Sequence, residues 1–177
     1  MTSTLTPSRP AQASSLSLDF EALYRSARDD VFAYVATLLS DRAAAEDVTA
    51  LAFERAYRKQ RSLDAGRGSQ RAWLFGIARN AALDELRRRR RQATLTADPE
   101  DVRAVSVDDQ AEALLRRAAL RTALAKLPAR DRELIALKFH GDLDNAELAA
   151  VLGVSPSNAG TMLHRAMTKL RETLDAK

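Results

Sequence analysis

The sequence contains no cysteine in its 177 residues. The chain can therefore form no disulfide, offer no thiol nucleophile and bind no zinc through sulfur. Glycine is scarce at 6 residues and aromatic residues make up 5% of the chain. No stretch alternates β-branched with polar residues, whereas Leu and Ala recur at helical spacing. We therefore expect an all-α fold, and any redox control would need a partner protein.

Long hydrophobic runs are also missing. The chain has no apolar run of about 18 residues, the length that a membrane-spanning helix needs. Residues 1–13 contain one arginine and lack the apolar core of a secretory signal. The net charge of +4 is modest evidence for an acidic partner. We expect a cytoplasmic protein that does not insert into membranes.

The first part of the chain predicts a tail followed by a helical domain. Residues 1–17 are rich in Ser, Thr, Pro and Ala, and this composition favours disorder. Apolar residues at helical spacing then predict three helices within residues 18–91, with a Gly-containing turn at 64–69 before the third. The apolar pattern of the third helix ends at Arg87–Arg91.

A change in charge marks the boundary to a second domain. Between residues 92 and 112 six acidic residues face one arginine, and Pro99 interrupts any helix. We interpret this segment as an acidic linker. Helical periodicity resumes over residues 113–177, where Pro128 either stops one helix or opens the next. The expected fold is therefore two small helical domains joined by an acidic linker.

The second domain contains the signals of a helix-turn-helix. Asp144 and Glu147 fit a capping box at the start of a short helix. Gly153 suits the left-handed residue that ends a helix, and Ser155 followed by Pro156 suits the start of the next. A short helix, a tight turn and a longer helix form the motif that places its second helix in a DNA major groove.

Signs of an enzyme are missing. The sequence shows no nucleophile with a nearby base, no phosphate-binding glycine loop and no cluster of metal ligands. His164 has no neighbouring ligand and is a poor candidate for metal binding. We expect a non-enzymatic protein without a cofactor or a metal.

Four segments together resemble a known family. They are Ala45–Arg58, Arg71–Asn80, Leu127–Glu133 and Leu163–Ala166. In this order they are similar to the extracytoplasmic-function sigma factors of the sigma-70 family, over nearly the whole chain after residue 18. The resemblance implies a protein that directs core RNA polymerase to specific promoters and helps to open the −10 element. It also implies promoter DNA, the β and β′ subunits of polymerase and an anti-sigma factor as partners.

The resemblance assigns residues to three surfaces. The residues implied in docking on core polymerase are Asp47, Phe53, Glu54, Arg55 and Arg58. Those implied at the −10 element are Trp73, Arg79, Asn80, Arg87 and Arg88. Those implied at the −35 element are Ser155, Ser157, Asn158, Gly160, Thr161, His164 and Arg165.

Two departures from the family pattern concern these surfaces. Ala50 and Leu51 stand where the docking helix often carries polar residues. The recognition helix lacks two expected cations, so its contact with DNA should be less electrostatic. Asn158 and Thr161 are one helical step apart, and an Asn amide pairs well with an adenine edge. Gly160 indicates a close approach to DNA or to a neighbouring helix, or a position where glycine is simply tolerated.

Several features have a second interpretation. Arg87–Arg91 is either a solvated helix end or a contact with the promoter backbone. Trp73 and Phe75 either stack on unpaired bases or pack in the core, and core packing is the expected role of Trp73. At the level of the whole chain, the alternatives are a stand-alone dimeric helix-turn-helix regulator and a helical adaptor that binds only protein.

Overall fold

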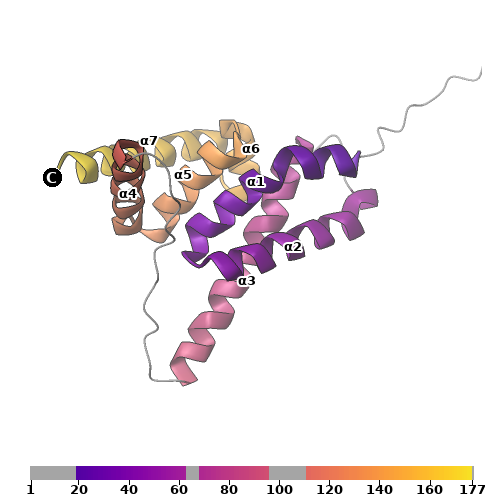
Figure 1. The fold of residues 1–177 in the computed structure, drawn as a ribbon. Helices are drawn as coiled ribbons and strands as arrows, with labels where there is room; N and C mark the ends of the chain where they lie inside the picture. Colours follow the sequence, from indigo (N-terminus) through magenta and orange to yellow (C-terminus); the bar gives the residue numbers. More distant parts are fainter. Residues whose placement is uncertain (1–18, 63–67, 96–110, 177) are drawn as a thin grey trace, which may run out of the picture.

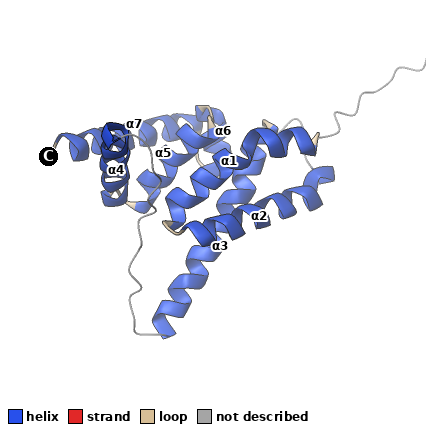
Figure 2. Ribbon diagram, in the orientation of Figure 1, coloured by secondary structure: helices blue, strands red, loops and turns tan. Residues whose placement is uncertain are grey.

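A computed structural model describes residues 19–62, 68–95 and 111–176. This part of the chain is helical and contains no strand (Figure 2), which confirms the predicted all-α class. The expected disordered tail lies outside the described residues, as does most of the acidic linker. The helices are α1 (Phe20–Leu39), α2 (Arg42–Lys59), a 3-10 turn (Gln60–Ser62), α3 (Gln70–Leu95), α4 (Ala111–Lys126), α5 (Ala129–Gly141), α6 (Asn145–Leu152) and α7 (Pro156–Asp175).

Helices α1, α2 and α3 form the first half of the molecule. Asp19 caps α1 by accepting a hydrogen bond from the Ala22 amide at 3.0 Å, and Asp41 caps α2 through the Ala44 amide at 3.1 Å. Ser40, between the two helices, adopts a left-handed conformation with φ of 53°. Two local signals thus produce the sharp turn that lays α2 against α1.

The third helix is longer than its apolar pattern. Helix α3 continues past Arg91 to Leu95, and its C-terminal end extends beyond the other helices (Figure 1). Arginine is a good helix former, and Arg88 and Arg89 pair with Glu85 one turn earlier. These pairs support a helical segment that has no apolar core to pack against.

Helices α4 to α7 form the second half and include the predicted helix-turn-helix. The capping box at α6 is present, since Asp144 accepts from the Glu147 amide while the Glu147 side chain accepts from the Asp144 amide. Gly153 is left-handed with φ of 69°, and Ser155 caps α7, which begins at Pro156. All three local predictions are confirmed.

The two halves pack against each other, an arrangement that the sequence left open. Helix α1 lies alongside α5, and α3 contacts both α5 and α6 (Figure 1). The buried core is continuous across this boundary, because Tyr34 and Phe75 of the first half and Leu134 and Leu137 of the second are all fully buried. One face of α3 is therefore covered by the second half.

Candidate nucleic-acid and polymerase interface

Helix α2 presents a stripe of exposed side chains. Asp47, Leu51, Glu54 and Arg58 follow one another at helical spacing on its outer side. Leu51 is 37% exposed, and Arg58 pairs with Glu54 at 2.6 Å. We call these four residues the α2 stripe. Leu51 adds apolar area among charged side chains, as is typical of the surfaces that bind other proteins. The docking residues assigned from the sequence did not include Leu51.

Two other residues assigned to docking lie differently. Phe53 is only 5% exposed, and its ring packs against Tyr24 with centroids 4.8 Å apart. It supports the outer surface from beneath and offers no face to a partner. Arg55 donates to Asp84 of α3 at 3.3 Å and so joins two helices.

Helix α3 has two faces with different environments. Arg79 and Leu83 point towards the second half, where they line a groove of about 340 Å³ together with Arg132 of α5. Asn80 and Arg87 lie on an exposed face. The residues assigned to the −10 element are thus divided between a covered face and an open one.

The two aromatic residues of α3 have different roles. Phe75 is fully buried, its ring lies 5.5 Å from that of Tyr34, and the Arg71 guanidinium sits 5.3 Å from its centroid. The interpretation that Phe75 stacks on a DNA base is therefore wrong, because its ring belongs to the core. Trp73 is partly buried, packs against the core and keeps some exposed area.

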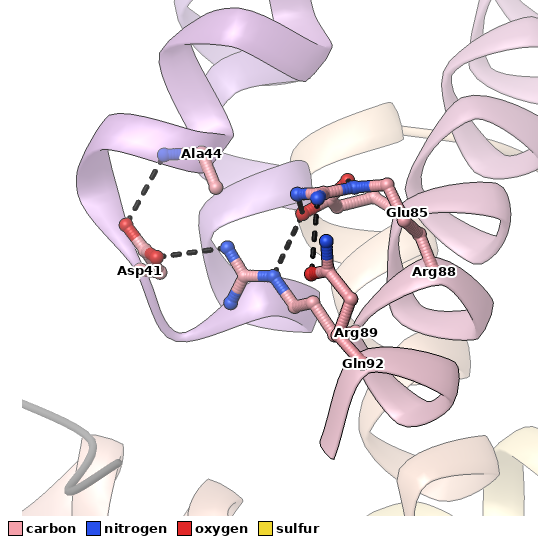
Figure 3. Close-up of polar contacts among 6 residues, drawn as sticks. All are labelled: Asp41, Ala44, Glu85, Arg88, Arg89 and Gln92. Carbon is pink, nitrogen blue, oxygen red and sulfur yellow. Dashed lines mark hydrogen bonds and ion pairs between the residues drawn. The ribbon is translucent and has the colours of Figure 1, made fainter. Parts of the chain in front are cut away.

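The arginine run is tied into a network of carboxylates (Figure 3). Glu85 accepts two hydrogen bonds from Arg88, both at 2.7 Å, and one from Arg89 at 2.8 Å. Arg89 also donates to Asp41 at 2.8 Å, the residue that caps α2. Arg89 therefore fastens α3 to the start of α2, a role that the sequence did not indicate. Arg87 has an exposed partner, Asp84, at 3.2 Å.

This network perturbs the acidity of its central carboxylate. Hydrogen bonds from Arg88 and then from Arg89 lower the pKa of Glu85 from its ordinary 4.5 to about 2, although burial acts in the opposite direction. When folding lowers the pKa of a carboxyl group, the ionised group stabilises the folded state. This stabilisation is complete at pH values above the ordinary pKa. That stabilisation is lost as the pH falls from about 4.5 towards 2.

Replacing Glu85 with glutamine should lower the free energy of unfolding by about 1–2 kcal/mol at pH 7, because two charge-assisted contacts become neutral. The difference from the wild type should shrink as the pH falls through the range between the two pKa values. Denaturant unfolding at pH 7 and pH 3 measures it. Glu46→Gln is the control, since Glu46 pairs with Arg42 on the surface of a single helix and exposed pairs contribute little. A loss that is the same at both pH values would contradict the assignment.

The N-terminal part of α7 is open to solvent. Ser155 accepts from the Asn158 amide at 3.2 Å, and Thr161 donates its hydroxyl to the Ser157 carbonyl at 3.0 Å. The residues of this part that are exposed are Ser155, Ser157, Asn158, Thr161, His164 and Arg165. In a helix-turn-helix, the N-terminal part of the second helix is generally the part that faces base edges.

A groove beside α7 adds a residue that the sequence assignment missed. Asn158, Met162 and Arg165 line it from α7, and Arg130 lines it from the first turn of α5. Arg130 approaches the Met162 sulfur at 3.9 Å and remains exposed. Two arginines from separate helices therefore line the same groove as Asn158.

Gly160 faces a neighbouring helix. A β-carbon placed on it would lie 3.2 Å from the Nδ2 atom of Asn145, the first residue of α6. This contact supports the second of the interpretations made from the sequence, a close approach of two helices within the helix-turn-helix.

Replacing Gly160 with alanine should stabilise the protein by less than about 1 kcal/mol, because the gain in helix propensity is offset by crowding of the Asn145 amide. In an Asn145→Ala background the crowding is removed, so the same change should give the full gain. Thermal or denaturant unfolding of the four proteins in this cycle measures the coupling. Equal effects in both backgrounds would show that the contact has no energetic consequence.

The part of the chain that the structure describes contains neither a candidate metal site nor a candidate membrane-spanning helix. No group of three acidic or histidine side chains is arranged to hold a metal ion. None of the described helices is both long and apolar enough to cross a bilayer.

Together, two packed helical halves, one of them with a helix-turn-helix, and helices with exposed arginines are typical of a helical DNA-binding protein. The comparisons with known proteins identify its family. Residues 23–92 match the family described as Sigma-70 region 2, and residues 117–170 match Sigma-70, region 4. The chain belongs to the sigma-70 family and is an extracytoplasmic-function (ECF) sigma factor. Proteins of this family are not enzymes; they direct core RNA polymerase to promoters.

Relatives over most of the chain agree with this assignment. ECF RNA polymerase sigma factor SigL of Mycobacterium tuberculosis is 32% identical over 154 residues, covering 86% of this chain and 87% of the relative. SigM of Bacillus subtilis is 26% identical and covers 87% and 94%. Sigma regions 2 and 4 in one chain support a sigma factor over the stand-alone regulator considered from the sequence.

Solved structures are similar as well. The sigma factor RpoE of Bartonella quintana, solved in complex with the anti-sigma factor NepR, matches with a TM-score of 0.78 and 26% identity. This match covers 89% of the present chain and 97% of RpoE. CnrH, solved with the cytosolic domain of CnrY, matches with a TM-score of 0.65 and 28% identity, covering 89% and 88%.

Proposed function

We propose that the two halves divide promoter recognition between them. The α2 stripe, which consists of Asp47, Leu51, Glu54 and Arg58, docks on core polymerase. The α3 helix holds the separated −10 strand, and the N-terminal part of α7 reads the −35 duplex. The acidic linker joins these two activities, and the chain itself performs no chemistry.

One observation carries this proposal. The α2 stripe and the open face of α3 with Asn80 and Arg87 belong to one three-helix unit with a shared buried core, and Arg89 and Arg55 also connect α3 to α2. A unit of this kind fixes a polymerase contact and a DNA contact relative to each other. Backbone contacts from arginine position such a helix, while an exposed amide such as Asn80 can pair with an unstacked base.

Run-off transcription tests the division. Core polymerase is reconstituted with the protein, and a pool of promoter fragments from the source genome is transcribed. Asn80→Ala should reduce open-complex formation without weakening core binding, whereas Leu51→Asp should weaken core binding and leave the isolated fold unchanged. Failure of the wild type to bind core while it protects two symmetric half-sites one helical turn apart would overturn the proposal.

A second partner is expected in the cell. The similar sigma factors RpoE and CnrH were each solved with a partner protein, and RpoE is bound to an anti-sigma factor. The match to RpoE spans both halves of the present chain. This similarity supports control by an anti-sigma factor. Because its partners are polymerase and DNA, the proposed site of action is the cytoplasm.

A further inference from the structure

A methionine sulfur lies in the groove beside α7. The chain has no cysteine and three methionines, so oxidation at sulfur can occur only on methionine. Met162 is half-buried and lines a groove of about 290 Å³ together with Asn158 and Arg165. A small oxidant that enters this groove can therefore reach a sulfur next to the residues proposed to read the −35 duplex.

A guanidinium stands beside this sulfur. The Nη2 atom of Arg130, in the first turn of α5, donates to the Met162 sulfur at 3.9 Å. A thioether sulfur is a weak acceptor, so this contact leaves the exposed Arg130 available to a stronger one. Asp131 pairs with Lys169 of α7 at 2.5 Å and ties the first turn of α5 to α7. The sulfur and the guanidinium are therefore kept next to each other.

The same helix carries a second methionine in a different environment. Met167 lies five residues after Met162, which places it on another side of a helix with 3.6 residues per turn. It shares that side with Leu163 and Leu170, which pack in the core, and it does not line the groove. The two methionines of α7 are therefore a matched pair, one inside the groove and one outside it.

We propose that Met162 is a site of reversible oxidation by hydrogen peroxide, and that its sulfoxide withdraws Arg130 from promoter DNA. The inference rests on the proposed role of α7 at the −35 element. A lone pair of the sulfur attacks one oxygen of the peroxide, and the O–O bond breaks. The departing hydroxide takes the proton from the transferred oxygen and leaves as water. The sulfur loses two electrons, and the peroxide gains them.

The added oxygen changes the partner of Arg130. Oxidation turns an apolar side chain into a polar one, and its oxygen is a much better acceptor than the sulfur. A hydrogen bond from a charged guanidinium spans about 2.7–2.9 Å, so an oxygen on this sulfur can accept one from Arg130 after small side-chain rotations. A guanidinium held in this way no longer neutralises a DNA phosphate. Binding should become weaker and less dependent on salt.

Peptide mapping tests the site of oxidation. The full chain is treated with hydrogen peroxide, the oxidant is removed, and tryptic peptides are quantified by mass spectrometry. Trypsin cleaves after Arg165, so Met162 and Met167 fall in separate peptides. Met162 should oxidise faster than Met167, and methionine sulfoxide reductases A and B together should reverse the change. Faster oxidation of Met167 would overturn the assignment of the site.

DNA binding tests the consequence. The oxidised chain, freed of peroxide, is assembled with untreated core polymerase and titrated with a promoter fragment at several salt concentrations. The affinity should fall by about 10-fold, as for the loss of one contact with a charged group, and the salt slope should shrink by about 0.9. Reductase treatment should restore both. Unchanged affinity of a chain oxidised at Met162 would refute the proposal.

Two variants assign the effect to one sulfur. Each variant is compared with itself before and after peroxide. Met162→Leu should show no peroxide effect, whereas Met167→Leu is the matched control and should respond as the wild type does. Leucine replaces methionine with little change of volume, so both variants should fold. An equal loss of affinity in Met162→Leu would place the responsible oxidation elsewhere.

Arg130→Ala tests the role of the guanidinium. Its removal should weaken binding by the reduced protein and abolish the further loss caused by peroxide, because both changes act on one contact. An undiminished peroxide effect in this variant would contradict the withdrawal of Arg130. If the reduced wild type does not bind the fragment with core polymerase, the proposed function fails instead, and the peptide map still decides whether Met162 is the preferred site of oxidation.

Discussion

Replacement of Phe75 by alanine should lower the free energy of unfolding by about 3–5 kcal/mol, the range found when a buried phenylalanine is truncated. The ring is fully buried, and its neighbours come from both halves of the molecule. Tyr34 of α1 lies edge-on at 5.5 Å, and a β-carbon on Gly141 of α5 would lie 3.5 Å from the ring. The cavity therefore opens where three helices meet. Denaturant unfolding followed by circular dichroism measures the loss.

Trp73→Ala is the comparison that separates core packing from DNA contact. Because Trp73 is only partly buried, its truncation should cost less stability than that of Phe75. If its exposed part stacks on an unpaired base, holoenzyme affinity for a single-stranded −10 oligonucleotide should fall by about 1–3 kcal/mol. The opposite ranking, with the larger stability loss at Trp73, would show that the two rings have been assigned the wrong roles.

The helix-turn-helix could be predicted residue by residue because its signals are local. Asp144 and Glu147 satisfy each other's backbone groups within one turn, so their spacing alone reveals the start of α6. Gly153 and Pro156 act through their own backbone dihedral angles. None of these effects depends on the rest of the fold, and the structure places α6 and α7 where the sequence predicted them.

The boundary between the halves could not be predicted in this way. The pairs of Arg71 with Asp30 and of Arg79 with Glu133 join residues 41 and 54 positions apart. Surface arginines and carboxylates are abundant in this chain, and no spacing identifies which of them meet. The burial of Phe75 could not be predicted for the same reason. The periodicity of α3 reveals one apolar face of the helix, but it does not reveal that α5 covers another face.

The end of α3 shows a different limit. The apolar pattern stops at Arg87–Arg91, yet the helix continues to Leu95. Apolar periodicity reports burial, and a helix that extends beyond the body of the protein has little surface to bury. Its stability comes from helix propensity and from the pairs that Glu85 makes with Arg88 and Arg89. The same lack of packing that removes the apolar pattern from this segment also leaves Arg87 exposed.

Replacement of Asn158 by alanine should weaken binding to the preferred −35 sequence by about 1–3 kcal/mol, or about 5- to 150-fold, and should relax the preference at one base pair. Asn158 is exposed in the first turn of α7, where its backbone amide is already used by the Ser155 cap and its side chain is left for a base edge. Arg130 and Arg165 flank it in the same groove and would position it on the backbone. The measurement is holoenzyme binding to a promoter selected by run-off transcription and to its single base-pair variants.

Asn145→Ala is the matched control, because Asn145 is also exposed but begins the preceding helix. It should change affinity for all variants by the same factor, as expected for a residue that at most contacts phosphate. A uniform loss with Asn158→Ala would mean that the residue only supports the fold of α7 or the approach to the backbone. Specificity would then have to come from Thr161 and Arg165 on the next turn. A selective loss places base recognition in the first turn of α7, where this chain lacks the expected cations and an amide is the group best suited to distinguish adenine.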